Sequence, residues 1–304
     1  MVRMAAADFH TAYEEAMARW PVPVERREVV SEFGTTRVNV CGAAGGPPLV
    51  LLHGGGTTSA AWYAMAAALA PTHRLYAVDQ MGTPGLSVPG GRAVRRPADL
   101  SDWLDGVLDG LGLASAALLG HSYGGWVALR HAVHTADGGP ARSSGARVDR
   151  LVLLDPTRCF AGFRLPYLAR ALPLFLRPGE PSTRRLLEWE AYGEPPAPGT
   201  VRLMGRGAVA FRDAKVVTGP RPDATRLRGS GVPVLVLLAG RSRAHDVRRV
   251  AAGARRALPD AVVTTVPGVG HHAMPDDPTG EVGRRVLSFL AAAPGAHPAP
   301  PAAP

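Results

Sequence analysis

The chain has 304 residues, of which 46% are hydrophobic and 19% are charged, which is typical of a globular protein and excludes a mainly disordered one. No run of about 18 uninterrupted apolar residues occurs, so we predict no membrane span, and the first ten residues lack the pattern of a signal peptide. The formal net charge is +9, but the arginines are scattered and no nucleic-acid-binding module is recognisable, so we predict no nucleic-acid partner.

Hydrophobic patterning along the first half of the chain predicts helices and strands in alternation. Helical spacing of apolar residues marks the helices, and short apolar or alternating runs mark the strands. We expect helices at 8–19, 60–70, 100–111 and 126–134, and strands at 24–30, 36–41, 48–52, 74–78 and 116–119.

The second half begins with a polar loop at 137–144 and a buried strand at 150–155. The alternation of strands and helices then stops. Residues 156–231 show only patches of helical spacing and a segment rich in Pro and Gly at 193–199. A strand at 232–238, a helix at 247–258, a strand at 261–266 and a helix at 280–292 follow. Strands alternating with helices predict a parallel α/β sheet, whose ligand site lies at the carboxyl ends of its strands.

The motif Gly120-His121-Ser122-Tyr123-Gly124 lies between the apolar run 116–119 and the helical run 126–131. A serine attacks well only if its Oγ projects from the backbone towards a substrate and a base. A sharp strand-to-helix turn does this, and it needs small residues two before and two after the serine. We therefore predict Ser122 as the nucleophile and the backbone N–H of Tyr123, at a helix N-terminus, as an oxyanion donor.

A run of glycines, His53-Gly54-Gly55-Gly56, follows the predicted strand at 48–52. Consecutive glycines let the backbone approach a ligand with its N–H groups turned inward. We predict Gly55 as the second oxyanion donor, with Gly56 as the alternative.

The glycine run, the motif around Ser122 and the later Gly270-His271 follow one another in an order that resembles the α/β-hydrolase fold superfamily, over roughly residues 45–290. Residues 51–62 and 76–79, with the glycine turn that follows, are similar to bacterial serine carboxylesterases of that superfamily. The resemblance implies an eight-stranded, mostly parallel sheet flanked by helices, with a helical cap inserted between strands six and seven. It also implies a Ser–acid–His triad and no cofactor.

The cap boundaries follow from the irregular segment. We expect residues 1–155 and 232–292 to form the hydrolase core, 156–231 the cap, and 293–304 a disordered tail. The cap segment holds 13 Lys/Arg and 6 Asp/Glu, which we interpret as a solvated basic surface rather than a device that steers anions. We expect its apolar side chains to cover Ser122 while the arginines face solvent; that apolar side consists of Leu168, Leu172, Leu176, Leu186, Leu187 and Trp189.

The acid of the triad departs from the pattern of the superfamily. The resemblance implies an acid about three residues after Gly240, but Arg243 stands there and has no acceptor atom. Two aspartates remain as candidates. Asp155 ends the predicted sixth strand and is our first choice, whereas Asp246 precedes a helix and is equally suited to cap it.

The base is predicted to be His271, which follows a strand-ending Pro-Gly-Val-Gly loop, rather than its neighbour His272. We expect the substrate pocket to be lined by His53, Gly54, Trp62, Met81, Phe160 and His272.

These features predict hydrolysis of a carboxylic ester of small or medium apolar character through an acyl-enzyme. A carbon–carbon bond hydrolase or thioester hydrolase with the same triad, and a non-enzymatic small-ligand receptor on a hydrolase scaffold, are the alternatives. Only two cysteines occur, with no Cys/His cluster at zinc spacing, so we predict no metal site. We expect a cytoplasmic protein with free thiols, acting as a monomer or homodimer on a small-molecule ester.

Overall fold

The computed structural model describes residues 2–136, 147–277 and 280–292. The loop predicted at 137–144 and the tail at 293–304 lie outside this part. Within the described ranges, no helix is both long and apolar enough to cross a membrane. Cys41 and Cys159 are buried free thiols.

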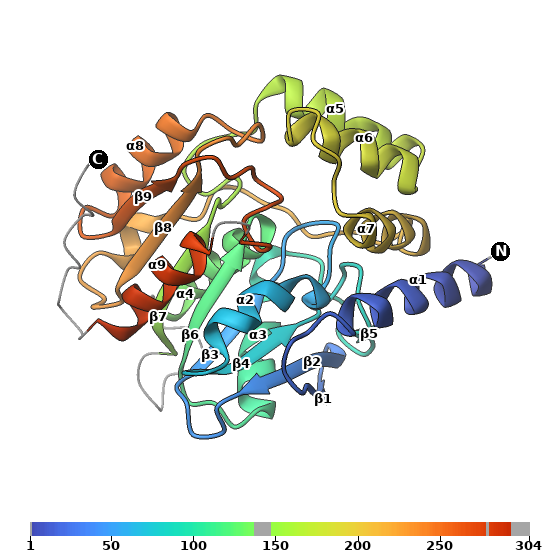
Figure 1. The fold of residues 1–304 in the computed structure, drawn as a ribbon. Coiled ribbons are helices and arrows are strands. Elements are labelled where there is room, and N and C mark those ends of the chain that lie inside the picture. The colour runs from blue at the N-terminus through green and yellow to red at the C-terminus, as the bar shows by residue number, and fades with distance from the viewer. Residues whose placement is uncertain (1, 137–146, 278–279, 293–304) are drawn as a thin grey trace.

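A single sheet forms the centre of the molecule, and its main path runs β1-β2-β4-β3-β6-β7-β8-β9 (Figure 1). β1 pairs antiparallel with β2, and β2 with β4, whereas every neighbouring pair from β4 to β9 is parallel. The strands of this path are β1 (Glu25–Ser31), β2 (Gly34–Gly42), β3 (Pro48–Leu52), β4 (Arg74–Val78), β6 (Ala116–His121), β7 (Val148–Leu154), β8 (Val234–Ala239) and β9 (Val262–Val266).

The main path has the eight strands expected, and the mostly parallel sheet with flanking helices is confirmed. The two-residue strand β5 (Val88–Pro89), which pairs with Gly34 and Thr35 of β2, was not predicted. A two-residue strand carries too few side chains to produce a recognisable pattern in the sequence.

Helices cover both faces of the sheet (Figure 1). One face packs against α3 (Pro97–Gly110), α4 (Tyr123–Ala136) and α8 (Val247–Ala257). The other packs against α1 (Val2–Met17), the short η1 (Ser59–Trp62), α2 (Tyr63–Leu69) and α9 (Glu281–Ala291).

Alternate residues of the central strands supply the two hydrophobic cores. Val50 and Leu52 of β3 belong to the core under α3 and α4, whereas Leu49 and Leu51 belong to the core under α2 and α9. Because both faces of these strands are buried, their sequences are continuously apolar rather than alternating.

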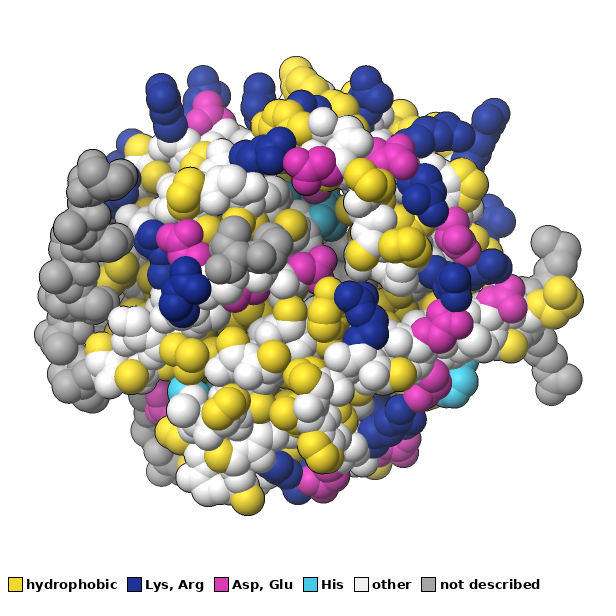
Figure 2. All heavy atoms as spheres, viewed as in Figure 1, with side chains coloured by type: hydrophobic (Ala, Val, Ile, Leu, Met, Phe, Trp, Pro, Cys, Tyr) yellow, Lys and Arg dark blue, Asp and Glu magenta, His cyan; other side chains and the backbone are white. Residues whose placement is uncertain are grey.

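Three helices stand between β7 and β8: α5 (Leu165–Leu176), α6 (Glu180–Glu190) and α7 (Pro198–Ala210); the short η3 (Ala224–Leu227) follows. They lie together at one end of the sheet, where α7 packs against α1 (Figure 1). α5 exposes large apolar side chains to solvent: Leu165 is 80% exposed and Phe175 is 79% exposed. In Figure 2 this apolar surface and many Lys and Arg side chains occupy the upper edge of the molecule.

The turn between β6 and α4 requires its glycines. A Cβ on Gly120 would lie 2.3 Å from the carbonyl oxygen of Gly124, and a Cβ on Gly124 would lie 2.0 Å from that of Leu52. These neighbours are backbone atoms of the sheet and helix, so they cannot move aside as a flexible side chain would. Ser122, between the two glycines, has a φ of 52°.

We therefore expect Gly124→Ala to lower the free energy of unfolding by about 2 kcal/mol or more, because the added methyl overlaps the backbone of β3. Denaturant unfolding would measure the loss. Gly45→Ala is the matched control, since no atom lies within 4 Å of a Cβ there. Equal stability of the two variants would contradict this account of the turn.

Candidate active site

Ser122, Asp155 and His271 meet at the carboxyl edge of the sheet. Ser122 directly follows β6, Asp155 directly follows β7, and His271 lies in the loop after β9. The side chains join in one chain of hydrogen bonds: Nε2 of His271 lies 2.9 Å from Oγ of Ser122, and Nδ1 lies 2.6 Å from Oδ2 of Asp155. Because an ionised carboxylate only accepts, Nδ1 carries the proton and Nε2 is free to accept from the hydroxyl.

Backbone hydrogen bonds hold the first two residues in unusual conformations. Ser122 and Asp155 both have positive φ, at 52° and 41°. The N–H of Ser122 donates to the carbonyl of Leu154 at 3.0 Å, and that of Asp155 to Leu237 at 2.7 Å. Both residues thus continue the hydrogen bonding of the sheet while their side chains turn towards His271, and such strain is typical of functional sites.

The two candidate acids stand in different environments. Asp155 is fully buried and bonded to His271. Asp246 instead caps α8, accepting from the backbone N–H of Arg249 at 3.1 Å, and its side chain is exposed. The structure therefore brings Asp155, and not Asp246, to the histidine.

Burial by itself would raise the pKa of the Asp155 carboxyl. The charge and hydrogen bonds of His245 and His271 outweigh that effect and hold the pKa of Asp155 well below its usual range. The carboxylate is thus ionised at neutral pH, as a partner of a protonated imidazole must be.

The predicted oxyanion donors lie beside Ser122. Gly55, Gly56 and Tyr123 all line the same cavity as the serine, and a Cβ on Gly55 would lie 3.7 Å from Cβ of Tyr123. Tyr123 is the first residue of α4, so its N–H precedes the hydrogen bonds of the helix. Its phenol is anchored away from the turn by donating to the carbonyl of Val217 at 2.8 Å.

A cavity of about 800 Å³ opens above Ser122. Of the six residues predicted to line the substrate pocket, His272 is among its lining residues and the other five are not. Trp62, Met81 and Phe160 are side chains of the hydrophobic cores.

The other two residues predicted for the pocket, His53 and Gly54, begin the glycine run and do not line the cavity. His53 is buried, accepting from the backbone N–H of Gln80 at 3.3 Å. Gly54 packs against the ring of His121, where a Cβ would lie 2.7 Å from Nδ1. Proximity in sequence to a motif of the site therefore does not show whether a side chain points into the core or into the cavity.

The helices between β7 and β8 supply much of the cavity lining. Leu168 and Leu186 line it as expected. Leu172 and Leu176 are exposed instead, Leu187 packs against α7, and Trp189 lies under Arg243. The lining also includes Arg158, Arg212 and Lys215. Some basic residues of this segment therefore border the cavity, in addition to those that face only solvent.

His272 forms a second buried imidazole–carboxylate pair beside the first. Its Nδ1 is hydrogen-bonded to Oε2 of Glu190, at the end of α6, and its ring meets that of His271 edge-on at 5.0 Å. Burial lowers the pKa of His272, but Glu190, together with Asp155 and Asp276, outweighs that effect, so the net pKa lies above the ordinary value. Burial likewise raises the pKa of Glu190, but His272, together with His271, outweighs that effect, so the net pKa of Glu190 lies below its ordinary value.

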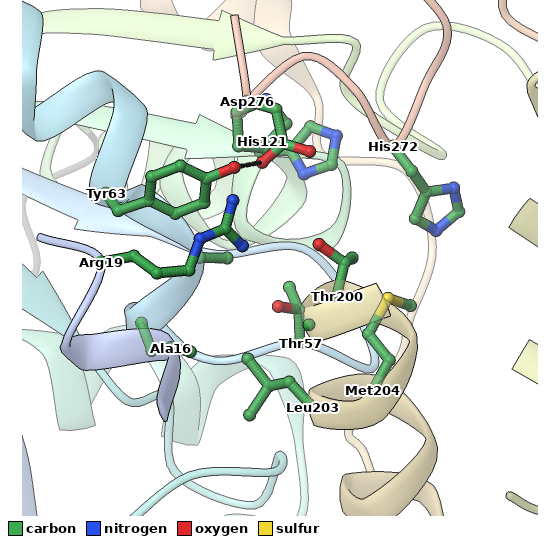
Figure 3. A pocket seen from close by; sticks show the side chains of 14 residues that line it. Ala16, Arg19, Thr57, Tyr63, His121, Thr200, Leu203, Met204, His272 and Asp276 are labelled. Atoms are coloured by element: carbon green, nitrogen blue, oxygen red, sulfur yellow. Dashed lines mark hydrogen bonds between the residues drawn. The ribbon is translucent and has the colours of Figure 1, made fainter. Parts of the chain in front are cut away.

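His272 also borders a small pocket of about 40 Å³, whose lining includes Arg19, Tyr63 and Asp276 (Figure 3). There Tyr63 donates to Asp276 at 3.0 Å, and the guanidinium of Arg19 lies 3.8 Å from the centre of the Tyr63 ring. These contacts join the segment after α1, helix α2 and the loop that carries His271, so they brace that loop from outside the cavity.

Sequence reasoning missed three residues that contact this site. His245 donates to Oδ1 of Asp155 at 2.9 Å, and Nε2 of His121 donates to the carbonyl of His271 at 2.9 Å. Glu190 is the third. His245 lies in the loop where the superfamily pattern places its acid, which is a signal that the sequence carried, whereas nothing around Glu190 marks it.

The chain is similar to known hydrolases in sequence and in fold. Residues 49–285 match the sequence pattern of the family described as "Alpha/beta hydrolase family". Carboxylesterase YbfK of Bacillus subtilis (strain 168) is 30% identical over 292 residues, which cover 93% of each chain. Within the part of the chain that the structure describes, no group of three or more His, Cys, Asp or Glu residues is placed to hold a metal ion.

Solved structures agree with these matches. The crystal structure of carboxylesterase CesB (YbfK) from Bacillus subtilis has a TM-score of 0.83 at 28% identity and covers 95% of this chain and 99% of its own. That of naproxen esterase (carboxylesterase NP), also from Bacillus subtilis, has a TM-score of 0.81 at 26% identity, covering 94% and 98%. With a family match over most of its length and relatives aligned over nearly all of it, this chain belongs to the alpha/beta hydrolase family.

Proposed function

We propose that the protein is a serine carboxylesterase with Ser122 as nucleophile, His271 as base and Asp155 as the acid that orients the base. The observation that carries this proposal is the continuous chain of hydrogen bonds from Ser122 through His271 to Asp155. The relatives named as carboxylesterases support ester hydrolysis as the reaction.

In the first half of the reaction, Oγ of Ser122 attacks the ester carbonyl carbon while Nε2 of His271 takes the hydroxyl proton. The negative charge that develops on the carbonyl oxygen is stabilised by the N–H groups of Gly55 and Tyr123, with Gly56 as the alternative donor. His271 then gives its proton to the leaving alcohol, and the acyl group remains bonded to Oγ.

In the second half, a water molecule gives a proton to His271 and attacks the acyl carbon. Collapse of the second tetrahedral intermediate returns the proton to Oγ and releases the carboxylic acid. Asp155 stays ionised throughout and stabilises the imidazolium that forms in each half.

We further propose that residues 156–231 act as a cap over this site and select small or medium apolar esters. Apolar and aromatic side chains of that segment line the cavity, among them Phe163, Tyr167, Leu168 and Leu186. The hydrogen bond between Glu190 and His272 ties α6 to the loop that carries His271. The predictions of a cytoplasmic enzyme and of a monomer or homodimer rest on the sequence.

Replacing the nucleophile tests the reaction directly. We expect Ser122→Ala to fold normally and to lower kcat for a p-nitrophenyl ester by about 10⁶-fold, because no other group can form the acyl-enzyme. Ser115→Ala, just before the other end of β6, is the control and should keep wild-type turnover. A folded Ser122→Ala protein retaining more than about a thousandth of the activity would exclude Ser122 as the nucleophile.

Two aspartate variants test which residue is the acid. Asp155→Asn should lower kcat by about a thousandfold or more, since an amide cannot stabilise the imidazolium. Asp246→Ala should keep kcat and lose about 1 kcal/mol of stability, because it removes only a helix cap. Turnover and thermal midpoint should be measured for both; the reverse pattern would assign the acid to Asp246.

The pair Glu190–His272 should make cap attachment depend on pH. The raised pKa of His272 and the lowered pKa of Glu190 stabilise the fold most between the ordinary values, about 4.3 and 6.5, and this contribution is lost as pH rises through the raised pKa of His272. Glu190→Gln should therefore lower Tm more at pH 6 than at pH 9. Glu188→Gln on the same helix is the control, and a pH-independent effect of Glu190→Gln would argue against an ion pair.

A further inference from the structure

Asp155 uses both oxygens of its carboxylate. Oδ2 accepts from His271, while Oδ1 accepts from Nε2 of His245 at 2.9 Å and from the backbone N–H of Ala239 at 3.0 Å. Both Oδ1 donors come from β8 and the loop after it, where the superfamily pattern would place the acid itself. In this chain the proposed acid, Asp155, follows β7, and the loop after β8 supplies a hydrogen-bond donor to it.

His245 is built into the interior. His245 is 2% exposed, and it does not line the cavity above Ser122. The backbone of the loop is held by pairing with Phe163 and by a 2.9 Å hydrogen bond from Arg164 to Ala244. Nδ1 of His245 has no hydrogen-bond partner among the described residues, so the bond to Asp155 is the one polar contact of the ring there.

We propose that His245 is a positioning residue of the hydrolytic reaction, which holds the Asp155 carboxylate so that Oδ2 faces Nδ1 of His271. This inference rests on the proposed function, because it assigns His245 a role in that same triad. The ring touches neither the substrate cavity nor Ser122; it bonds to Asp155 and packs edge-on against the ring of His271, with the ring centres 6.0 Å apart.

The hydrogen bond has an electrostatic consequence as well as a geometric one. A donor on Oδ1 withdraws negative charge from the carboxylate, so Oδ2 attracts the imidazolium form of His271 less strongly. Without His245, Oδ2 should attract the imidazolium form of His271 more strongly. The titratable groups that face His271 are His121, Tyr167, His245, His272 and Asp155, with Glu190 behind His272.

The test compares His245→Leu, which removes the donor, with His245→Gln, whose amide can reach the same oxygen. We expect His245→Leu to lower kcat about 10- to 100-fold with KM nearly unchanged, in the range found when a supporting partner is removed from an active-site ligand. The acid limb of the profile of kcat/KM against pH should move to higher pH, because His271 must be neutral to act as base. His245→Gln should restore most of kcat and return the limb towards wild type.

His131→Leu is the matched control, since His131 is also fully buried but lies on α4 near Asp105, away from the triad. It should affect stability without moving the acid limb. If His245→Leu does not fold, His245→Asn serves in its place, because its shorter amide does not reach Asp155.

The proposal would be overturned if His245→Leu left both kcat and the acid limb of the pH profile unchanged. It would also be overturned if His245→Leu lowered kcat without moving the acid limb and His245→Gln did not restore kcat. A titration of His271 by ¹⁵N NMR reads the same shift without turnover. A wild-type protein with no esterase activity would therefore refute the proposed function, whereas an unshifted His271 in His245→Leu would refute the role of His245.

Discussion

The hydrogen bond from Nδ1 of His271 to Oδ2 of Asp155 is the contact on which the geometry of the site depends. It sets the tautomer of the imidazole, and the tautomer leaves Nε2 able to accept from Ser122. The bond is possible because neighbouring parallel strands all end at one edge of the sheet. Ser122 and Asp155 continue the backbone hydrogen bonds of that edge, so neither side chain has to be positioned by a flexible loop.

A fully buried carboxylate beside an apolar core is costly unless its oxygens are paired. Asp155 meets this requirement with three donors, from His271, His245 and Ala239. Since one of them is a backbone N–H of β8, the sheet itself contributes to keeping the acid ionised. Asp155 follows β7, and two of its donors come from the end of β8 and the loop after it, so in this chain the carboxylate bonded to His271 does not come from the position of Arg243.

A second imidazole–carboxylate pair, His272 and Glu190, stands next to the first and joins the loop after β9 to α6. The two adjacent histidines therefore face different partners: His271 faces the sheet and His272 faces the helices between β7 and β8. Attachment of those helices and orientation of the proposed base thus depend on the same short loop. Their apolar side chains line the cavity, and α5 leaves several others exposed at its edge.

The sequence by itself determined the order of strands and helices, because buried parallel strands and amphipathic helices leave distinct periods in the chain. It also identified the turn around Ser122, since the close approach of strand and helix excludes any side chain at Gly120 and Gly124. Local pattern was sufficient for these features because the physical constraints act between residues close in sequence.

The contact of Asp155 rather than Asp246 with His271, the contact of His245 with Asp155 and the pairing of Glu190 with His272 are visible only in the tertiary structure. Each depends on which side chains from distant segments meet; Asp155 and His271, for example, are 116 residues apart. The same reason explains why most residues predicted to line the substrate pocket do not line the cavity. Trp62, Met81 and Phe160 adjoin the motifs in sequence, but packing turns them into the cores, while the cavity is lined by the separate segment between β7 and β8.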